Sequence, residues 1–231
     1  MINTENNGHS IEWYRECIDY LRDFMRKERY ETLCQTLDKR TKYMTLMAEN
    51  TFHPHNASAL VRHCEAFGVQ TMHTVESYYK FDLSENIMRG THKWVDICSH
   101  ETTAEALASL RKEGYRIVAT TPHRESCTPE TFDVTKGKFV LVFGTEHTGI
   151  SDEVIAQADE FLKIPMCGMV ESLNVSASAA ILVYMLSERM RHEVDDWHLS
   201  EEEYHEILYR WSRESVRDAD NVLRRRYGDD F

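Results

Sequence analysis

Three short polar segments of this 231-residue chain carry residue types that could bind and act on a small ligand. They occupy residues 53–62, 144–151 and 166–174 and read HPHNASALVR, GTEHTGIS and MCGMVESLN. Each follows an apolar stretch that predicts a β-strand. Ligands in parallel α/β sheets bind beyond the carboxyl ends of the strands, so the three segments predict one pocket at that edge of a sheet.

The segment 144–149, GTEHTG, places two glycines where a phosphate could approach the backbone. It lacks the Gly-Lys-Ser/Thr ending of a P-loop and the Gly-x-Gly-x-x-Gly spacing of a dinucleotide site. Glu146, taken alone, is typical of a turn. The chain also has no Gly-x-Ser-x-Gly elbow, and none of its six cysteines has the sequence context of a nucleophile. These patterns do not support a nucleoside triphosphate site.

Histidine and cysteine side chains around the first segment raise the question of a metal site: His53, His55, His63 and Cys64. Their spacing is not that of a closed zinc site, and adjacent helical residues point in different directions, so we predict no metal. In the same segment, Asn56 alone predicts a helix N-cap, and Arg62 alone predicts a solvent-exposed arginine.

Strands and helices alternate along the middle of the chain. Short apolar runs predict strands at residues 43–48, 69–75, 94–98, 115–120, 139–143 and 161–164. Helical spacing of apolar residues predicts helices after Asn56, which Gly68 would end, at 102–113, at 151–158 and from 175. This alternation predicts an α/β domain with a mainly parallel sheet.

The helix from Val175 is apolar on nearly every face. A helix that is apolar all round is expected to be buried. The polar loop before it, which contains Glu171, Ser172 and Asn174, would then lie beside the core.

Amphipathic helices at both ends of the chain, about residues 10–39 and 200–224, stand outside the alternation. We therefore expect an N-terminal helical extension at 1–41, a central domain at 42–192 and a C-terminal helical extension at 193–231.

Composition and charge limit the class of protein. The chain is 42% hydrophobic and has no apolar run of the roughly 20 residues that span a bilayer. Its N-terminus lacks a signal-peptide pattern and its cysteines are scattered, which predicts a cytoplasmic protein with reduced thiols. A net charge of −12 argues against nonspecific coating of nucleic acid. The basic clusters at 22–29 and 224–226 are then either solvated helix faces or local basic surfaces.

Taken together, the three segments resemble the motifs of the SpoU/TrmH family of RNA ribose 2′-O-methyltransferases, which belong to the SPOUT class. The matching patterns are Asn56-x-x-x-x-x-Arg62 with Phe67-Gly68, then Phe143-Gly144-x-Glu146-x-x-Gly149-x-Ser151, then Ile164-Pro165-Met166-x-Gly168-x-x-x-Ser172-Leu173-Asn174-Val175-Ser176. The third pattern is long and specific. The resemblance covers about residues 42–192.

The resemblance implies a parallel α/β sheet with a C-terminal deep trefoil knot, a homodimer, and S-adenosylmethionine as the methyl donor. By motif position, the cofactor-binding residues would be Thr120, Gly144, Ile164, Met166 and Leu173. The partner would be RNA, with a guanosine in the D-loop of tRNA favoured as the target. Ribosomal RNA as the substrate, or RNA binding without catalysis by the same fold, are the alternatives.

The same resemblance implies catalytic roles for Arg62, Asn56, Glu146, Ser172 and Asn174. Arg62 would activate the ribose hydroxyl together with an RNA phosphate, as a general base or by stabilising the developing alkoxide. Arginine gives up a proton only at high cost near neutral pH, which favours charge stabilisation. Asn56 and Asn174 would orient Arg62 and the ribose, Glu146 would anchor Arg62 or the loops, and Ser172 would line the site.

Overall fold

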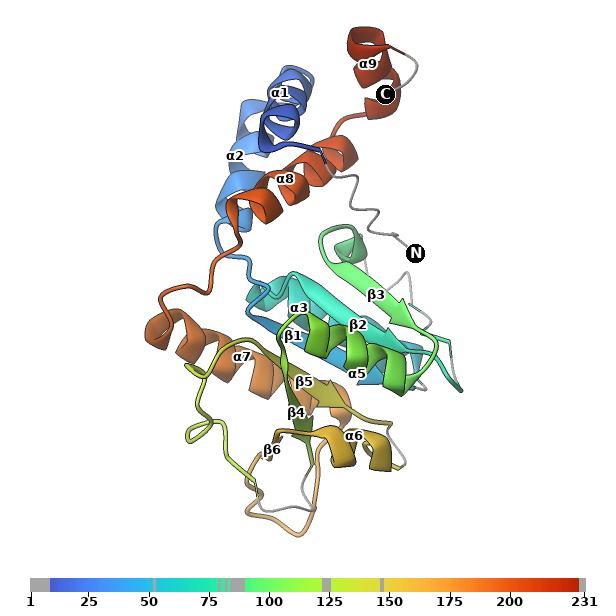
Figure 1. Cartoon of the computed structure of the whole chain (residues 1–231), viewed down its shortest axis with the longest axis vertical. Helices are drawn as coiled ribbons and strands as arrows, with labels where there is room; N and C mark the ends of the chain where they lie inside the picture. The colour runs from blue at the N-terminus through green and yellow to red at the C-terminus, as the bar shows by residue number, and fades with distance from the viewer. Residues whose placement is uncertain are drawn as a thin grey trace. The chain divides into compact units, whose positions relative to one another are not determined.

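The computed structural model describes residues 9–51, 53–78, 80–81, 83, 90–121, 126–145 and 148–228. In these residues the chain divides into two compact units (Figure 1). The sheet unit comprises residues 41–197, and the helical unit comprises residues 9–40 together with 198–228. The boundaries expected from the sequence fell after residues 41 and 192.

The sheet unit is built on a parallel sheet whose described strands lie in the order β3-β2-β1-β5-β4-β6. The strands are β1 (Met44–Glu49), β2 (Thr71–Val75), β3 (Asp96–His100), β4 (Arg116–Thr120), β5 (Phe139–Phe143) and β6 (Glu160–Leu162). Because every pair is parallel, all carboxyl ends lie at the same edge. The predicted α/β fold with a mainly parallel sheet is confirmed. The trefoil knot stays a prediction.

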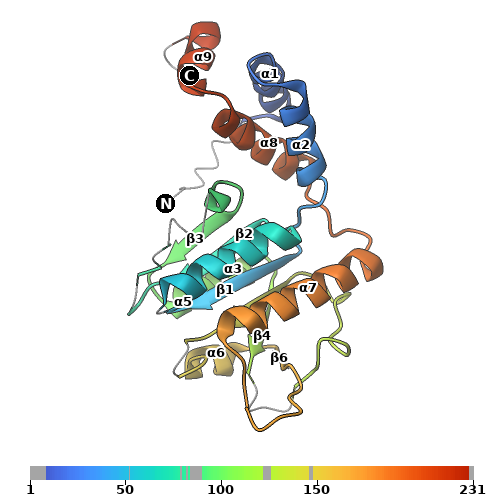
Figure 2. The same ribbon diagram turned by 180° about the vertical axis from the view of Figure 1, so that it is seen from behind.

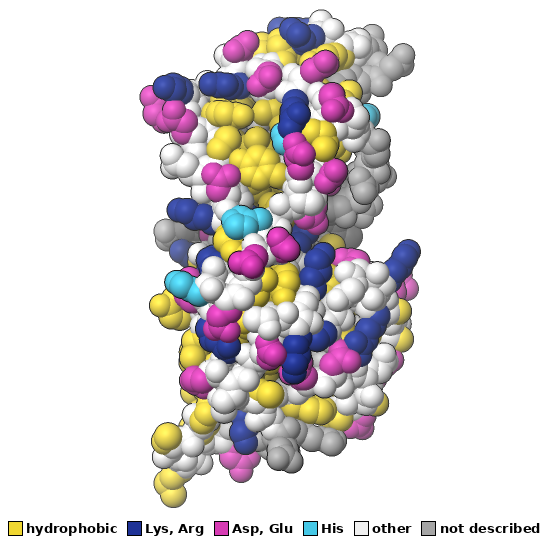
Figure 3. Space-filling model, turned by 60° about the vertical axis from the view of Figure 1, so that its left-hand side comes forward, with side chains coloured by type: hydrophobic (Ala, Val, Ile, Leu, Met, Phe, Trp, Pro, Cys, Tyr) yellow, Lys and Arg dark blue, Asp and Glu magenta, His cyan; other side chains and the backbone are white. Residues whose placement is uncertain are grey.

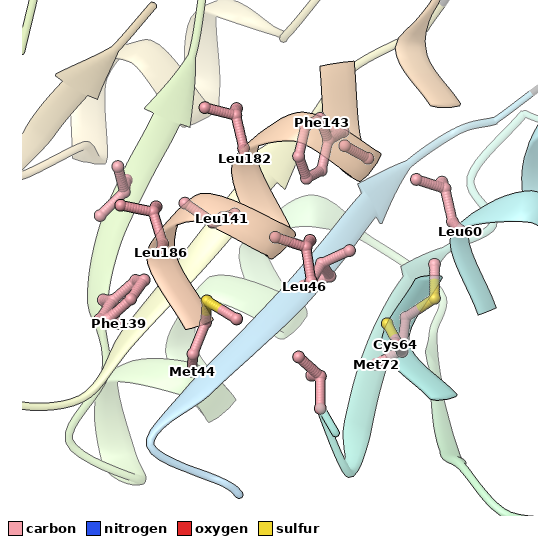
Figure 4. Packing of buried hydrophobic residues seen from close by; sticks show 14 of the residues in the cluster. Met44, Leu46, Leu60, Cys64, Met72, Phe139, Leu141, Phe143, Leu182 and Leu186 are labelled. Carbon is pink, nitrogen blue, oxygen red and sulfur yellow. The ribbon is translucent and has the colours of Figure 1, made fainter. Parts of the chain in front are cut away.

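Helices cover both faces of this sheet (Figures 1 and 2). They are α3 (Pro54–Phe67), α5 (Thr103–Lys112), α6 (Asp152–Gln157) and α7 (Val175–Glu193), with a short 3-10 helix, η1 (Thr91–Lys93). Side chains of β5 point alternately to the two faces of the sheet. Leu141 and Phe143 pack with α3 and α7 (Figure 4), whereas Val140 and Val142 pack with α5 and α6. Both faces of a parallel sheet are thereby buried, as the continuous apolar run of β5 predicts.

The start of α3 differs from the prediction. His53 is the N-cap, Pro54 is the first helical residue, and Asn56 lies inside the first turn. Proline is favoured at this position because it has no N–H to leave unsatisfied and its φ is already helical. The predicted end is confirmed, since Gly68 adopts the left-handed conformation with φ of 80°.

The expectation that the helix from Val175 is buried all round is wrong. One face of α7 lies in the core, but Ala177, Ile181 and Tyr184 are exposed. Their spacing of four and three residues puts them in one stripe. The preceding loop is also exposed rather than beside the core, with Met169 fully accessible. Figure 3 shows apolar side chains reaching the surface along one edge and at the lower tip of the sheet unit. The sheet unit covers only one side of an apolar helix.

The helical unit contains α1 (Ile11–Arg22), α2 (Lys27–Leu37), α8 (Glu201–Ser215) and α9 (Ala219–Tyr227). α1 packs along α8 and buries Cys17 and Leu21 in the same unit as Trp211. The single helix expected at 200–224 is instead two helices, because the chain turns at 216–218, where Asp218 has a φ of 58°. No helix among the described residues is long and apolar enough to cross a membrane.

Candidate active site

A pocket of about 610 Å³ lies at the carboxyl edge of the sheet, beyond the ends of β4, β5 and β6. Its walls come from residues at these three strand ends, from the loop that follows β5, and from the loop that leads into α7. The five predicted cofactor residues all line it: Thr120, Gly144, Ile164, Met166 and Leu173. Two of the predicted catalytic residues, Ser172 and Asn174, line it as well. The structure therefore brings the second and third sequence motifs together around one cavity.

Gly144 shows why the loop after β5 needs glycine. A Cβ built on Gly144 would lie 2.1 Å from the carbonyl carbon and oxygen of Gly149 and 2.2 Å from the backbone nitrogen of Ile150. The loop closes on itself there through hydrogen bonds between Thr145 and Gly149, of 3.0 Å and 3.1 Å. Gly149 has a φ of 71°, which favours glycine. This wall of the pocket is therefore backbone, and close approach of two chain segments defines its shape.

Asn174 joins the pocket to the first motif. It is the N-cap of α7, and its Oδ1 accepts hydrogen bonds from the Ser176 backbone nitrogen at 2.9 Å and hydroxyl at 2.8 Å. Its Nδ2 donates to Oδ1 of Asn56 at 3.3 Å. Asn56 is buried in the first turn of α3. The two asparagines predicted to act together are thus in contact, and each holds the other's amide orientation.

Arg62 is exposed on α3 and is not among the residues that line the pocket. The neighbouring His63 places this part of α3 beside the start of α7. Burial lowers the pKa of His63, a hydrogen bond with the Ser176 backbone opposes that shift, and the charge of Arg62 adds to it. His63 thus lies beside the N-terminal end of α7, whereas the exposed Arg62 next to it is outside the set of residues that line the cavity.

Glu146 lies outside the described residues. Within the described part of the chain, no group of three or more His, Cys, Asp or Glu side chains could hold a metal ion.

Glu49 is a buried polar residue that the sequence analysis missed. It ends β1 and is only 2% exposed. Its Oε1 accepts hydrogen bonds from the hydroxyls of Thr103 and Ser151, both at 2.6 Å, and its Oε2 accepts one from the Ser151 backbone nitrogen at 2.9 Å. A carboxylate at the end of a mostly apolar strand is the sequence signal that could have indicated it.

The two basic clusters seen in the sequence meet at one end of the helical unit. The Arg226 guanidinium lies 4.6 Å from the centre of the Tyr20 ring, and the rings of Tyr20 and Tyr227 are 6.2 Å apart. We call the exposed arginines there the basic cluster: Arg22, Arg26, Arg224, Arg225 and Arg226. Among the described residues, none of these five forms an ion pair with a carboxylate. Phe24 beside them is 49% exposed, so the cluster combines positive charge with accessible aromatic surface.

Comparison with known proteins matches residues 43–184 to the family model described as SpoU rRNA Methylase family. A tRNA (guanosine(18)-2′-O)-methyltransferase of Aquifex aeolicus is 38% identical over 82% of this chain and 91% of its own length. The enzyme of the same name from Borreliella burgdorferi is 33% identical over 87% of this chain and 91% of its own length.

Solved structures show the same fold. The crystal structure of the A. aeolicus TrmH/SpoU tRNA modifying enzyme superposes with a TM-score of 0.74 at 35% identity, and covers 83% of this chain and 98% of that one. The SpoU methyltransferase AviRb from Streptomyces viridochromogenes, solved with its cofactor S-adenosylmethionine, superposes with a TM-score of 0.56 at 20% identity, covering 69% of this chain and 62% of that one.

Proposed function

The chain belongs to the SpoU methylase family, and from that premise we propose that it transfers a methyl group from S-adenosylmethionine to a ribose 2′-oxygen in tRNA. The observation that carries the proposal is the pocket at the carboxyl edge of the sheet, which gathers residues of the second and third motifs. Relatives named for guanosine 18 of tRNA, matched over most of both chains, favour that nucleotide. We place the reaction in the cytoplasm, in keeping with the scattered cysteines.

The pocket has the dimensions and chemistry to hold S-adenosylmethionine. Its volume of about 610 Å³ falls inside the range of roughly 300–1,000 Å³ typical of cofactor sites. Aliphatic side chains such as Ile155, Ile164 and Leu182 offer apolar walls for an adenine ring, and Glu171 offers a negative charge near a cationic ligand. When bound, the cofactor supplies an electrophilic methyl group.

The residues of the chain then have to position and activate the ribose. We propose that the guanidinium of Arg62 holds an RNA phosphate and stabilises the alkoxide that develops on the ribose oxygen. The hydrogen bond between Asn174 and Asn56 keeps the amide that lines the pocket in one orientation. Ser172 lines the pocket beside it. Positioning of this kind can lower a barrier by several kcal/mol without further chemistry.

We also propose that the protein works as a homodimer through α7. The exposed stripe of Ala177, Ile181 and Tyr184 leaves apolar area that a second copy would bury. The Tyr184 ring lies 5.6 Å from that of Phe67 on α3, which extends the stripe. Ala179 on the same helix is fully buried in the sheet unit and does not belong to this stripe.

The test is transfer of labelled methyl from S-adenosylmethionine to unmodified tRNA, followed by digestion to nucleosides. Recovery of 2′-O-methylguanosine supports the proposal. Label in ribosomal RNA alone would keep the reaction and change the substrate. Folded protein that binds the cofactor and RNA but labels neither RNA would favour the non-catalytic alternative.

Arg62→Ala is the decisive variant in this assay, with Lys112→Ala as the control. Lys112 is an exposed cation at the end of α5, on the opposite face of the sheet. Arg62→Ala is expected to lose methyl transfer by at least about a hundredfold while its circular dichroism spectrum is unchanged, and Lys112→Ala is expected to retain wild-type activity. Activity of Arg62→Ala close to wild type would exclude the proposed role.

A further inference from the structure

We propose that Glu49 is a positioning residue for the cofactor pocket, which it reaches through Ser151 without touching the ligand. This inference rests on the proposed function, because it takes the pocket as the site of S-adenosylmethionine. Glu49 lies in neither the pocket lining nor the three motifs. What it holds, however, is the end of the loop that forms one wall of the pocket.

Strand geometry explains how Glu49 comes to face this loop. Successive side chains of a strand point to opposite faces, so Glu49 shares a face with Met47. Met47 packs in the core between the sheet, α5 and α6. Glu49, two residues after Met47, therefore faces the starts of α5 and α6. There Thr103 and Ser151 donate hydrogen bonds to it.

The carboxylate is suited to this position because all three groups that meet it are donors. An ionised carboxylate only accepts hydrogen bonds and has two oxygens to do so. Hydrogen bonds to a charged acceptor are stronger than those between neutral groups. Glutamine has the same shape but would turn an NH₂ donor toward at least one of these donors.

Ser151 connects the carboxylate to the pocket wall. Ile150 and Gly149 immediately before it line the pocket, and Gly144 packs against their backbone. The loop is thus closed at three successive points: the Thr145–Gly149 hydrogen bonds, the glycine contact, and the clamp of Glu49 on the Ser151 backbone nitrogen. Release of the last point would let residues 148–150 move while the strands stay in place.

The experiment measures the dissociation constant of S-adenosylmethionine by calorimetry, and the unfolding temperature, for full-length wild type and variants. Glu49→Gln is expected to raise the dissociation constant about tenfold, the equivalent of one charge-assisted hydrogen bond. Ser151→Ala, which keeps the backbone contact, is expected to raise it less. The double variant is expected to be no worse than Glu49→Gln alone, because both changes break the same link.

Thr45→Val is the matched structural control. Thr45 lies on the same strand and the same face, at the end far from the pocket, is fully buried, and donates its hydroxyl to the Thr71 carbonyl oxygen at 2.5 Å. It is expected to lower the unfolding temperature but leave cofactor affinity at the wild-type value. A merely structural role for Glu49 predicts the same pattern for Glu49→Gln, and that result would overturn the inference.

Two further outcomes separate this inference from the proposed function. Wild-type protein that fails to bind S-adenosylmethionine would overturn both. Wild-type binding with unchanged affinity in Glu49→Gln would overturn only the role of Glu49. If Glu49→Gln does not fold, Ser151→Ala decides, since wild-type cofactor affinity in that variant would equally contradict the clamp.

Discussion

In the sheet unit, the groups that shape the candidate site are backbone atoms and polar side chains held by hydrogen bonds, whereas the helical unit offers exposed arginines and aromatic rings. The pocket wall at Gly144 tolerates no added atom, and Asn56, Asn174 and Glu49 are each held by hydrogen bonds. The basic cluster, in contrast, consists of long, flexible arginine side chains at helix ends. The difference suggests that cofactor binding depends on shape and RNA binding on charge, so that the two can be perturbed separately.

The largest effect is expected from Gly144→Ala. The new methyl group would overlap the backbone of Gly149 and Ile150, so the loop has to shift, and we expect cofactor affinity to fall by about a hundredfold or more. Calorimetry with S-adenosylmethionine measures this. Gly168→Ala is the matched control, because its Cβ would meet nothing within 4 Å. Equal losses in both variants would show that the close approach at Gly144 does not shape the pocket.

Acid is expected to destabilise the sheet unit through His73. Burial, with a smaller contribution from His100, lowers the pKa of His73 from 6.5 to about 3. Its Nδ1 lies 3.1 Å from Nε2 of His100, and the other ring nitrogen of His100, Nδ1, lies 3.8 Å from Oε1 of Glu105. The unfolded chain takes up this proton first as pH falls below 6.5, so the stability contribution is complete above that pH and is lost progressively toward pH 3.

Between pH 7.5 and pH 5 the loss amounts to about 2 kcal/mol of unfolding free energy. Urea unfolding at the two pH values measures it. In His73→Gln this part of the pH dependence should disappear, whereas His55→Gln, which removes an exposed imidazole on α3, should keep it. A wild-type slope in His73→Gln would assign the acid sensitivity to other groups.

The helical unit should respond through RNA rather than through the cofactor. Arg224→Ala with Arg225→Ala removes two exposed cations of the basic cluster. We expect RNA affinity to fall about tenfold and its dependence on salt to become shallower, because fewer counterions are released from the phosphates. Filter binding at several salt concentrations measures both.

Lys39→Ala, an exposed cation of the helical unit outside the basic cluster, is the control and is expected to bind RNA as wild type does. Unchanged RNA binding in the double variant would show that the basic cluster is a solvated surface with no role in RNA binding. A change in cofactor affinity instead would remove the distinction between the two units.

The smallest effect is expected from Ser200→Ala. Ser200 and Glu203 form a reciprocal capping box at the start of α8, with hydrogen bonds of 3.2 Å and 2.9 Å. Its loss should cost about 1 kcal/mol of stability in the helical unit and leave methyl transfer at saturating substrates unchanged. Chemical denaturation monitored by tryptophan fluorescence tests this, since Trp211 is buried on the same helix.

Sequence patterns predicted the features that depend on local order and missed those that depend on distant partners. The continuous apolar run of β5 and the glycine after α3 are local signals, and both were correct. Glu49 could not be assigned, because its partners lie 54 and 102 residues further along the chain. The burial of α7 was overestimated because composition does not reveal whether a second apolar face has a partner within the unit.

The helical unit is assembled from the two ends of the chain, and this has a consequence for synthesis on the ribosome. α1 and α2 leave the ribosome before the sheet unit and α8, yet the apolar side chains of Cys17 and Leu21 are covered only in a unit completed by α8. The apolar faces of α1 and α2 must therefore stay exposed while the sheet unit folds, since domains generally fold as they emerge. Premature termination after the sheet unit would leave them exposed permanently, as a target for chaperones and proteases.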